Sequence, residues 1–403
     1  MHLLGATTMN ELKKIFPHEL QVDTMYSSPL FFDDGENMFL PPRKPLTLRH
    51  LKILEKWKLP YVVTTGNLIQ TKEAPQDTDD FEELTELEPL EDETNIAYKI
   101  AENIDSQSKE VMEMYNTFQK RVTTIYSHIY KRKVPNRKEI IDIAEEINQK
   151  IKTYWKEIII FINSKAGRNL TLAESALYTA FYAGIFAQNS AEKINSVNII
   201  ISALLHDVGM IFLPDFITQK KGILSSKEFE YIKQHPLYSM RFAENNLFMP
   251  KAISLPILEH HEQYNGEGYP KKLTTEQISS GGKLLALADS FVALISEKNY
   301  RDPYNCYEAM KILLLENKTK FYPEFVSAFI NLFGMYPLGQ LVELSNGSIA
   351  QVVEINPKNA FHPQVKILIE NNEADDNFQQ GLVINLLDEK EITIKRPYSP
   401  YNS

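Results

Sequence analysis

Residues 197–209 read VNIIISALLHDVG, an apolar helical run that ends in a histidine and an aspartate. Taken alone, the pair His206-Asp207 says little, because a histidine at the C-terminus of a helix is more often a cap that complements the helix dipole than a metal ligand. The surrounding segments are more informative, since they also repeat apolar residues at helical spacing. The stretch therefore predicts one helix of a larger helical domain.

This helical domain is predicted over residues 96–336. Pro135 ends one helix, the segment DIAEEINQKIKTYWKEIIIFI follows with one apolar face, and further helical patterns cover 170–188, 225–235, 252–262, 281–297 and 307–316. In the pattern SSKEFEYIKQH, we expect His235 to close a helix before Pro236. Such a succession favours a helical bundle, whose functional side chains lie on facing helices.

Two segments precede the helical domain. Residues 1–70 predict a small α/β module, with a turn at FFDDGENMF, helical spacing of Leu51, Leu54 and Trp57, and the β-branched run YVVTT. Residues 71–95 predict a solvated linker, because eleven acidic residues and no lysine or arginine stand between Glu73 and Glu93. The charged face of a helix is the alternative for this segment.

The pattern changes again after Pro337. Residues 337–403 alternate apolar and polar positions in short runs, and Asn346-Gly347 separates two of them. Asn-Gly between alternating runs is the strongest short-range signal for a β-hairpin. This extension is predicted to be a small antiparallel sheet packed on the helical domain.

The composition limits the function classes. It is 43% hydrophobic and 24% charged, with a net charge of −10 and a single cysteine, Cys306. One cysteine excludes an intramolecular disulfide framework, and no apolar run reaches the length of a signal peptide or membrane span, so we expect a cytoplasmic protein. Because the acidic segment carries the net charge, we expect no binding to duplex nucleic acid.

Residues with metal-binding chemistry gather in one part of the helical domain. Four of the nine histidines, His206, His235, His260 and His261, fall within 56 residues. Asp289 interrupts the apolar run LLALADSFVALI, where an unpaired charge is costly. Each has an ordinary alternative, a helix cap for a histidine or an arginine partner for the aspartate. Together they form a ligand set for Fe, Mn or Zn, and their number predicts two ions bridged by a carboxylate such as Asp207.

The order of these motifs resembles the HD-GYP family of cyclic di-GMP phosphodiesterases, within the HD phosphohydrolase superfamily. The matching pieces are LLHDVGMIFLPDFI (204–217), KKGILSSKEF (220–229), KQHP (233–236), EHHEQYNGEGYP (259–270) and LALADSFVALISEKNYR (285–301). The resemblance implies a mainly α fold, an HD-type helical bundle with a small antiparallel β C-terminal tail and a small α/β N-terminal module. It also implies hydrolysis of cyclic di-GMP to linear pGpG, with GMP as a further product, by a hydroxide that bridges two metal ions.

The resemblance further implies roles for individual residues. The catalytic pair is His206 and Asp207, and the ligands of two Fe or Mn ions, with a third ion as an option, are Glu174, His206, Asp207, His235, His260, His261 and Asp289. The substrate-binding residues are Lys221, Gly268, Tyr269, Pro270, Lys298 and Arg301. For Lys298 and Arg301 the alternative is an ordinary surface base after a helix.

Two positions depart from the family pattern. Glu174 stands where the superfamily usually has its first histidine; a carboxylate there favours Mn or Fe over Zn, but Thr171 to Glu174 is also a capping-box pattern. Met210 replaces the lysine of the usual HDxGK motif, a loss of about 1–3 kcal/mol of substrate or transition-state stabilisation.

The leading hypothesis is therefore a metal-dependent phosphodiesterase. The two departures motivate an alternative, a degenerate, non-catalytic module that binds cyclic di-GMP or a protein, and hydrolysis of another phosphoester is a third hypothesis. Residues 1–70 carry no metal-binding or phosphate-binding motif. By analogy, they are predicted to serve regulation through a homodimer or a signalling-protein partner.

Overall fold

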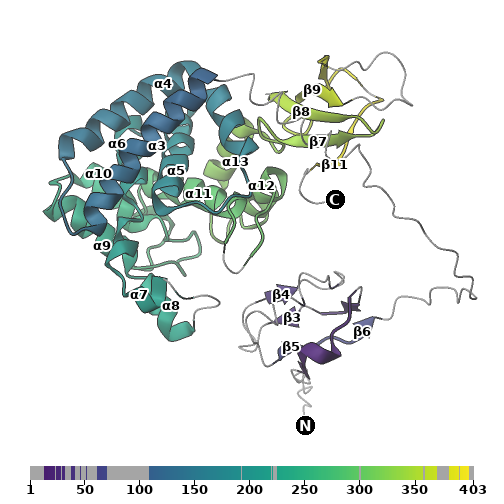
Figure 1. Cartoon of the computed structure of the whole chain (residues 1–403), viewed down its shortest axis with the longest axis horizontal. Helices are drawn as coiled ribbons and strands as arrows, with labels where there is room; N and C mark the ends of the chain where they lie inside the picture. The colour runs from purple at the N-terminus through teal and green to yellow at the C-terminus, as the bar shows by residue number, and fades with distance from the viewer. Residues whose placement is uncertain are drawn as a thin grey trace, which may run out of the picture. The chain divides into compact units, whose positions relative to one another are not determined.

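A computed structural model of the chain shows its fold (Figure 1). The structure describes residues 13–22, 24–28, 30–31, 38–40, 46, 51, 61–69, 109–191, 193–218, 220, 225–298, 301–356, 359–369, 381–389 and 391–398. The predicted acidic linker, most of the FFDDGENMF turn, Leu54, Trp57 and Lys221 lie outside the described residues. The chain divides into two compact units, residues 1–87 and 88–403. The division of the chain into the four segments proposed from the sequence therefore stays a prediction.

The first unit is built from short antiparallel strands. They are β1 (Lys13–Ile15), β2 (Met25–Tyr26), β3 (Leu30–Phe31), β4 (Met38–Leu40), β5 (Val62–Thr64) and β6 (Leu68–Ile69), with the 3₁₀ helix η1 (Pro17–Glu19). One sheet has the order β1-β5-β3-β4, and β2 pairs with β6. The strand predicted at YVVTT is β5, and it contributes Val62 to a small core with Leu20, Leu30 and Leu40.

The second unit is mainly helical. Its helices are α3 (Lys109–Tyr130), α4 (Arg137–Ser164), α5 (Leu172–Asn189), α6 (Ser196–Leu205), η2 (Val208–Phe212), α7 (Asp215–Thr218), α8 (Ser226–Ile232), α9 (His235–Asn245), α10 (Lys251–Glu259), η3 (Thr275–Gln277), α11 (Ser280–Ile295), α12 (Cys306–Leu315) and α13 (Pro323–Phe333). None of the helices among the described residues is long and apolar enough to cross a bilayer.

Helix α5 lies inside this bundle, packed against α3, α4, α6 and α11. Its sequence is apolar on nearly every face, which is the pattern of a helix surrounded by protein. The Tyr182 ring lies 4.9 Å from Phe291 of α11 and 5.1 Å from Phe333 of α13, measured between centroids. These aromatic contacts hold α5 and α11 together and thereby fix the helices that carry the predicted ligands.

The chain enters α9 differently from the expectation. His235 does not close the preceding helix: α8 ends at Ile232, and His235 is the first residue of α9, with Pro236 in its first turn. Proline suits this position because the first N–H groups of a helix have no partner within the helix. The prediction that Pro236 follows the end of His235's helix was therefore wrong.

The C-terminal part forms an antiparallel sheet on the bundle (Figure 1). Its strands are β7 (Leu341–Leu344), β8 (Ile349–Glu354), β9 (Gln364–Ile369), β10 (Val383–Asn385) and β11 (Ile394–Pro397), in the order β10-β9-β8-β7-β11. The predicted hairpin at Asn346-Gly347 joins β7 and β8. The buried core runs continuously from Val111 in α3 to Ile392 beside β11. The predicted fold class, a helical bundle with a small β tail, is confirmed.

Candidate metal centre

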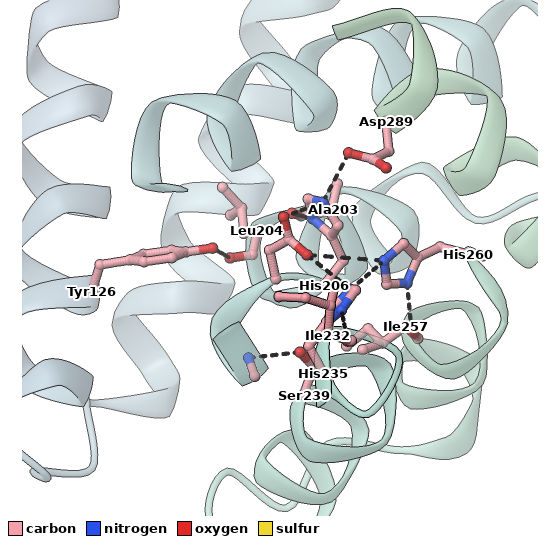
Figure 2. Close-up of polar contacts among 12 residues, drawn as sticks. Tyr126, Ala203, Leu204, His206, Ile232, His235, Ser239, Ile257, His260 and Asp289 are labelled. Carbon is pink, nitrogen blue, oxygen red and sulfur yellow. Dashed lines mark hydrogen bonds and ion pairs between the residues drawn. The ribbon is translucent and has the colours of Figure 1, made fainter. Parts of the chain in front are cut away.

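Three histidines share one backbone arrangement (Figure 2). The Nδ1 atoms of His206, His235 and His260 each lie 2.7 Å from the carbonyl oxygen three residues earlier, that of Ala203, Ile232 and Ile257 respectively. A carbonyl oxygen only accepts, so Nδ1 carries the proton and donates in each contact. The Nε2 atom of each ring is therefore directed away from its own helix, with its lone pair available when the ring is neutral.

Asp207 lies between these rings. Its Oδ1 is 3.1 Å from His235 Nε2 and 4.0 Å from His260 Nε2, whereas its Oδ2 is 3.6 Å from His206 Nε2. The two oxygens of one carboxylate thus face different histidines. The Asp207 side chain is 20% exposed, while the His206 and His260 side chains are fully buried. Asp207 therefore stands at the open edge of a buried cluster.

His261 and Asp289 complete the cluster. The His261 ring lies 4.2 Å from the His260 ring and 4.9 Å from the His235 ring, between centroids, because α10 ends at Glu259 and both histidines follow in a turn. Asp289 reaches in from α11, with Oδ1 3.2 Å from His206 Nε2. Adjacent residues on a regular helix point in different directions, but here the helix has ended. The turn that follows lets His260 and His261 face the same site.

The charges of the cluster shift its titration. Burial opposes protonation of His206, but the charges of Asp207 and Asp289 outweigh it and raise the pKa of His206 to about 9. Burial also opposes ionisation of Asp207, yet His206 and the hydrogen bond from His235 hold the pKa of Asp207 well below its usual range. Burial and neighbouring histidines lower the pKa of His260 and His261 well below the ordinary value.

These residues fit divalent transition-metal ions. The described residues contain two groups of donor atoms, and within each group all the atoms lie within 4.8 Å of one another. One group comes from His235, His260 and His261, and the other from His206, His260 and Asp289. Imidazole nitrogens and carboxylate oxygens are the donors that Fe, Mn and Zn accept. The cluster is a candidate metal site with His260 common to both groups.

Two family models match parts of the chain. A model of the HD domain matches residues 159–325, and a model of the KOW domain associated with HD domains matches residues 341–403. Residues 159–325 are therefore similar to the HD domain. The HD domain contains every residue of the cluster.

The relatives of this HD domain confirm the resemblance drawn from the motifs. The cyclic di-GMP phosphodiesterase PdeB of Borreliella burgdorferi is 34% identical over 181 residues, 45% of this chain and 48% of that protein. The cyclic di-GMP phosphodiesterase PA4108 of Pseudomonas aeruginosa is 28% identical over 226 residues, 56% of this chain and 54% of that protein. The chain therefore matches about half the length of these relatives. The solved HD-GYP-like protein Bd1817 of Bdellovibrio bacteriovorus covers 79% of this chain and 98% of its own at 17% identity, with a TM-score of 0.45, a likeness too weak to support a conclusion.

The loop that contains Gly268, Tyr269 and Pro270, called the GYP loop below, borders the cluster. The Tyr269 ring stacks on the His261 ring at 4.7 Å between centroids, with an angle of 27° between the planes. Gly268 lies so close to the preceding turn that an added Cβ would be 2.4 Å from the Gln263 nitrogen. The peptide bond between Tyr269 and Pro270 is cis. The loop thus forms one wall of the cluster, and the substrate contacts expected of these residues stay a prediction.

The other predicted substrate-binding residues follow α11. The Arg301 guanidinium donates to the carbonyl oxygens of Ala293 and Leu294 at 3.0 and 3.2 Å, near the C-terminus of α11. Lys298 and Arg301 also exchange two backbone hydrogen bonds of 3.2 Å. Arg301 therefore caps a helix in this structure. A substrate role for either residue stays a prediction.

Glu174 is engaged in the contacts of the capping-box alternative. Its Oε2 accepts hydrogen bonds from the backbone N–H and the hydroxyl of Thr171, at 2.9 and 2.7 Å. Its Oε1 accepts one from the Gln119 amide at 2.6 Å. Neither group of metal donors among the described residues includes Glu174. Its role as a ligand stays a prediction.

We expect Thr171→Ala to lower the free energy of unfolding by about 1 kcal/mol, because it removes the N-cap of the buried helix α5. Urea unfolding checks this value. Glu174→Gln, the companion variant, keeps the capping contacts but weakens a metal ligand. Metal content that is unchanged in Glu174→Gln would support the cap, and a lost ion would support the ligand.

Sequence reasoning did not identify four further residues around the cluster. Glu262 is buried and accepts hydrogen bonds from the N–H groups of Lys271 and Leu273, at 2.6 and 2.9 Å, which holds the GYP loop. The Ser239 hydroxyl accepts a hydrogen bond from the Gly209 N–H at 2.8 Å. The third is Glu259, whose carboxylate accepts a hydrogen bond from the Ser279 N–H at 3.0 Å. The fourth is Tyr126, whose hydroxyl donates to the Leu204 carbonyl at 3.2 Å. The acidic residues on both sides of His260-His261 were a usable signal for Glu259 and Glu262.

The raised pKa of His206 predicts proton release when a metal binds. A metal requires neutral His206, whereas without metal the ring is protonated below pH 9. The apparent affinity for Mn²⁺ should rise about tenfold per pH unit from 7 towards 9 and then level off. Calorimetric titration in buffers of different ionisation enthalpy checks this through the number of protons released. His260 and His261, with lowered pKa values, contribute none at pH 7. Affinity that does not change over this pH range would contradict the prediction.

Proposed function

We propose that the protein is a metal-dependent phosphodiesterase that hydrolyses cyclic di-GMP. The observation that carries the proposal is the common orientation of three histidines, each fixed through Nδ1 to a carbonyl oxygen. The Nε2 atoms of His206 and His235 face Asp289 and Asp207, and that of His260 lies 3.2 Å from His235 Nε2 and 4.0 Å from Asp207. A buried pair or a helix cap does not require three rings in the same tautomer. The names of the relatives, cyclic di-GMP phosphodiesterases, supply the substrate class.

The proposal assigns the ligands of two ions, Fe or Mn, to the two donor groups. His235, His260 and His261 form one group, and His206 and Asp289 join His260 in the other. Asp207 would serve as a ligand to both ions, since its oxygens face histidines of both groups. Bound cations would supply charge neutralisation on the phosphoryl oxygens and lower the pKa of a water molecule.

The protein's own residues prepare the site in three ways. The carbonyl hydrogen bonds fix each imidazole before any ligand binds, which reduces reorganisation. Burial of His206 and His260 keeps the cluster dry on the protein side, which strengthens its electrostatic interactions. Tyr269, stacked on His261, shields the ring and offers an aromatic face at the edge of the site. We assign substrate contacts to this loop and to Lys298, and linear pGpG as the product.

The alternative, a non-catalytic module that binds cyclic di-GMP, is motivated by one position. Met210 lies in η2, three residues after Asp207, where the family usually has a lysine. Without that cation, substrate can be held less firmly at its phosphate. Binding of cyclic di-GMP with no product would favour this alternative.

The deciding experiment incubates the full chain, loaded anaerobically with Fe²⁺ or Mn²⁺, with cyclic di-GMP. We expect metal-dependent formation of pGpG, measured by chromatography, and about two metal equivalents in the same sample. A Met210→Lys variant provides the matched comparison and should turn over faster, because it restores a cationic contact. A folded, metal-loaded protein that leaves cyclic di-GMP uncut would refute the proposal.

A further inference from the structure

A cavity outside the metal centre lies where the C-terminal end of α3 meets η2 and α9. Its volume is about 270 Å³, and its walls combine cationic, aromatic and carboxamide side chains. We propose that this cavity binds a nucleoside monophosphate, or a ligand of the same chemistry, a flat ring that carries a phosphate. The inference is independent of the proposed phosphodiesterase activity.

The charge of the cavity favours a phosphate. Arg132, Lys133 and Arg241 line it, and no acidic residue does. Within the described part of the chain, no carboxylate lies within ion-pair distance of any of the three. All three are exposed, and an anion with multiple oxygens could accept several charge-assisted hydrogen bonds from them.

The backbone of Arg132 is the second observation. Arg132 follows the end of α3 with φ = 58°, in the left-handed region where a helix normally ends on glycine. Its N–H donates to Ile129 and the next N–H, of Lys133, donates to His128, both at 2.9 Å, so the turn itself is well formed. A non-glycine residue in this conformation costs about 1 kcal/mol or more. Phe248, Lys272 and Lys318 also have positive φ, so the conformation alone does not select arginine; at this position it places a cationic side chain in the cavity wall.

The aromatic walls suit a flat ring. The Arg132 guanidinium lies 5.2 Å from the centroid of the Phe212 ring, and the Phe212 and Phe242 rings lie 5.6 Å apart at an angle of 41°. Tyr238 lines the same cavity, and its hydroxyl donates a hydrogen bond to the Gln234 side-chain oxygen at 2.6 Å. The Arg132 guanidinium already covers one face of Phe212, so a nucleobase would stack on the Arg132 guanidinium or on the Tyr238 ring. The carboxamides of Asn245 and Asn246 offer donors and acceptors to the edge of that base.

The test uses the full chain, treated with a chelator so that phosphate cannot bind a metal at the cluster. Calorimetry with GMP, UMP and inorganic phosphate should show that both nucleotides bind and that phosphate alone binds at least about tenfold more weakly. Arg132→Gly should weaken GMP binding about tenfold or more. This variant removes the side chain but suits the left-handed backbone, so the fold is retained.

Lys131→Ala is the matched control, because Lys131 is an exposed neighbour that does not line the cavity. Its affinity for GMP should equal that of the unmodified chain. The proposal is overturned if GMP does not bind at millimolar concentration, or if Arg132→Gly and Arg241→Ala both bind it normally. Equal affinity for GMP and inorganic phosphate would overturn the role of the aromatic walls.

Discussion

Replacement of Asp207 by asparagine is expected to reduce cyclic di-GMP turnover about a thousandfold or more. The two Asp207 oxygens face histidines of both donor groups, and its charge is stabilised by His206 and His235. Asparagine keeps the size and one acceptor oxygen but removes the negative charge that the proposed bridge requires. Because the site then loses a negatively charged ligand, the variant should also bind less metal.

Three measurements on one sample separate the causes: product formation, metal content and the thermal unfolding midpoint. Asp215→Asn is the matched control, since Asp215 is an exposed carboxylate in the first turn of the nearby helix α7. It should match the unmodified chain in all three. A folded Asp207→Asn variant with full metal content and normal turnover would remove Asp207 from the site.

Replacement of Gly209 by alanine is expected to lower the free energy of unfolding by about 3 kcal/mol or more. A Cβ on Gly209 would lie 2.1 Å from the His235 carbonyl oxygen and 2.8 Å from the Ser239 nitrogen, both backbone atoms of α9. The helix would have to move, and the hydrogen bond from the Gly209 N–H to Ser239 would be lost. Since α9 carries His235, metal affinity should fall with stability.

Denaturant unfolding and metal titration check the two effects together. Gly381→Ala is the comparison: Gly381 has φ = 89° but nothing within 4 Å of an added Cβ. That variant should lose only about 1 kcal/mol through backbone strain and should bind metal normally. If Gly209→Ala is as stable as Gly381→Ala, the close approach of η2 and α9 is looser than the structure indicates.

The sequence predicted most of the cluster because its chemistry conflicts with its surroundings. Asp289 was identifiable inside an apolar helix, and the paired His260 and His261 stood out at a helix end. The structure brings these residues together with His206, Asp207 and His235. The alternating pattern after Pro337 likewise predicted the strands of the β tail, including the hairpin at Asn346-Gly347.

The remaining features depend on contacts between segments far apart in the chain. Tyr126 reaches the Leu204 carbonyl from another helix, and nothing near Tyr126 in the sequence marks it. The position of His235 was misjudged because a proline can either follow the end of a helix or stand in its first turn. The sequence around Pro236 does not distinguish these two cases. Glu174 shows the converse limit, since one carboxylate satisfied a ligand pattern and a capping pattern equally well in the sequence.

The attachment of the β tail has a consequence for how such chains can be recombined. The Asn163 amide of α4 donates to the Leu338 carbonyl at 2.8 Å, and Lys156 of α4 pairs with Glu354 of β8. The same core includes Phe333 of α13 and Val342 of β7. Although the HD and KOW segments match separate family models, they share one interior here. An exchange of the tail between relatives would therefore succeed only if the facing surfaces of α4 and α13 were exchanged with it.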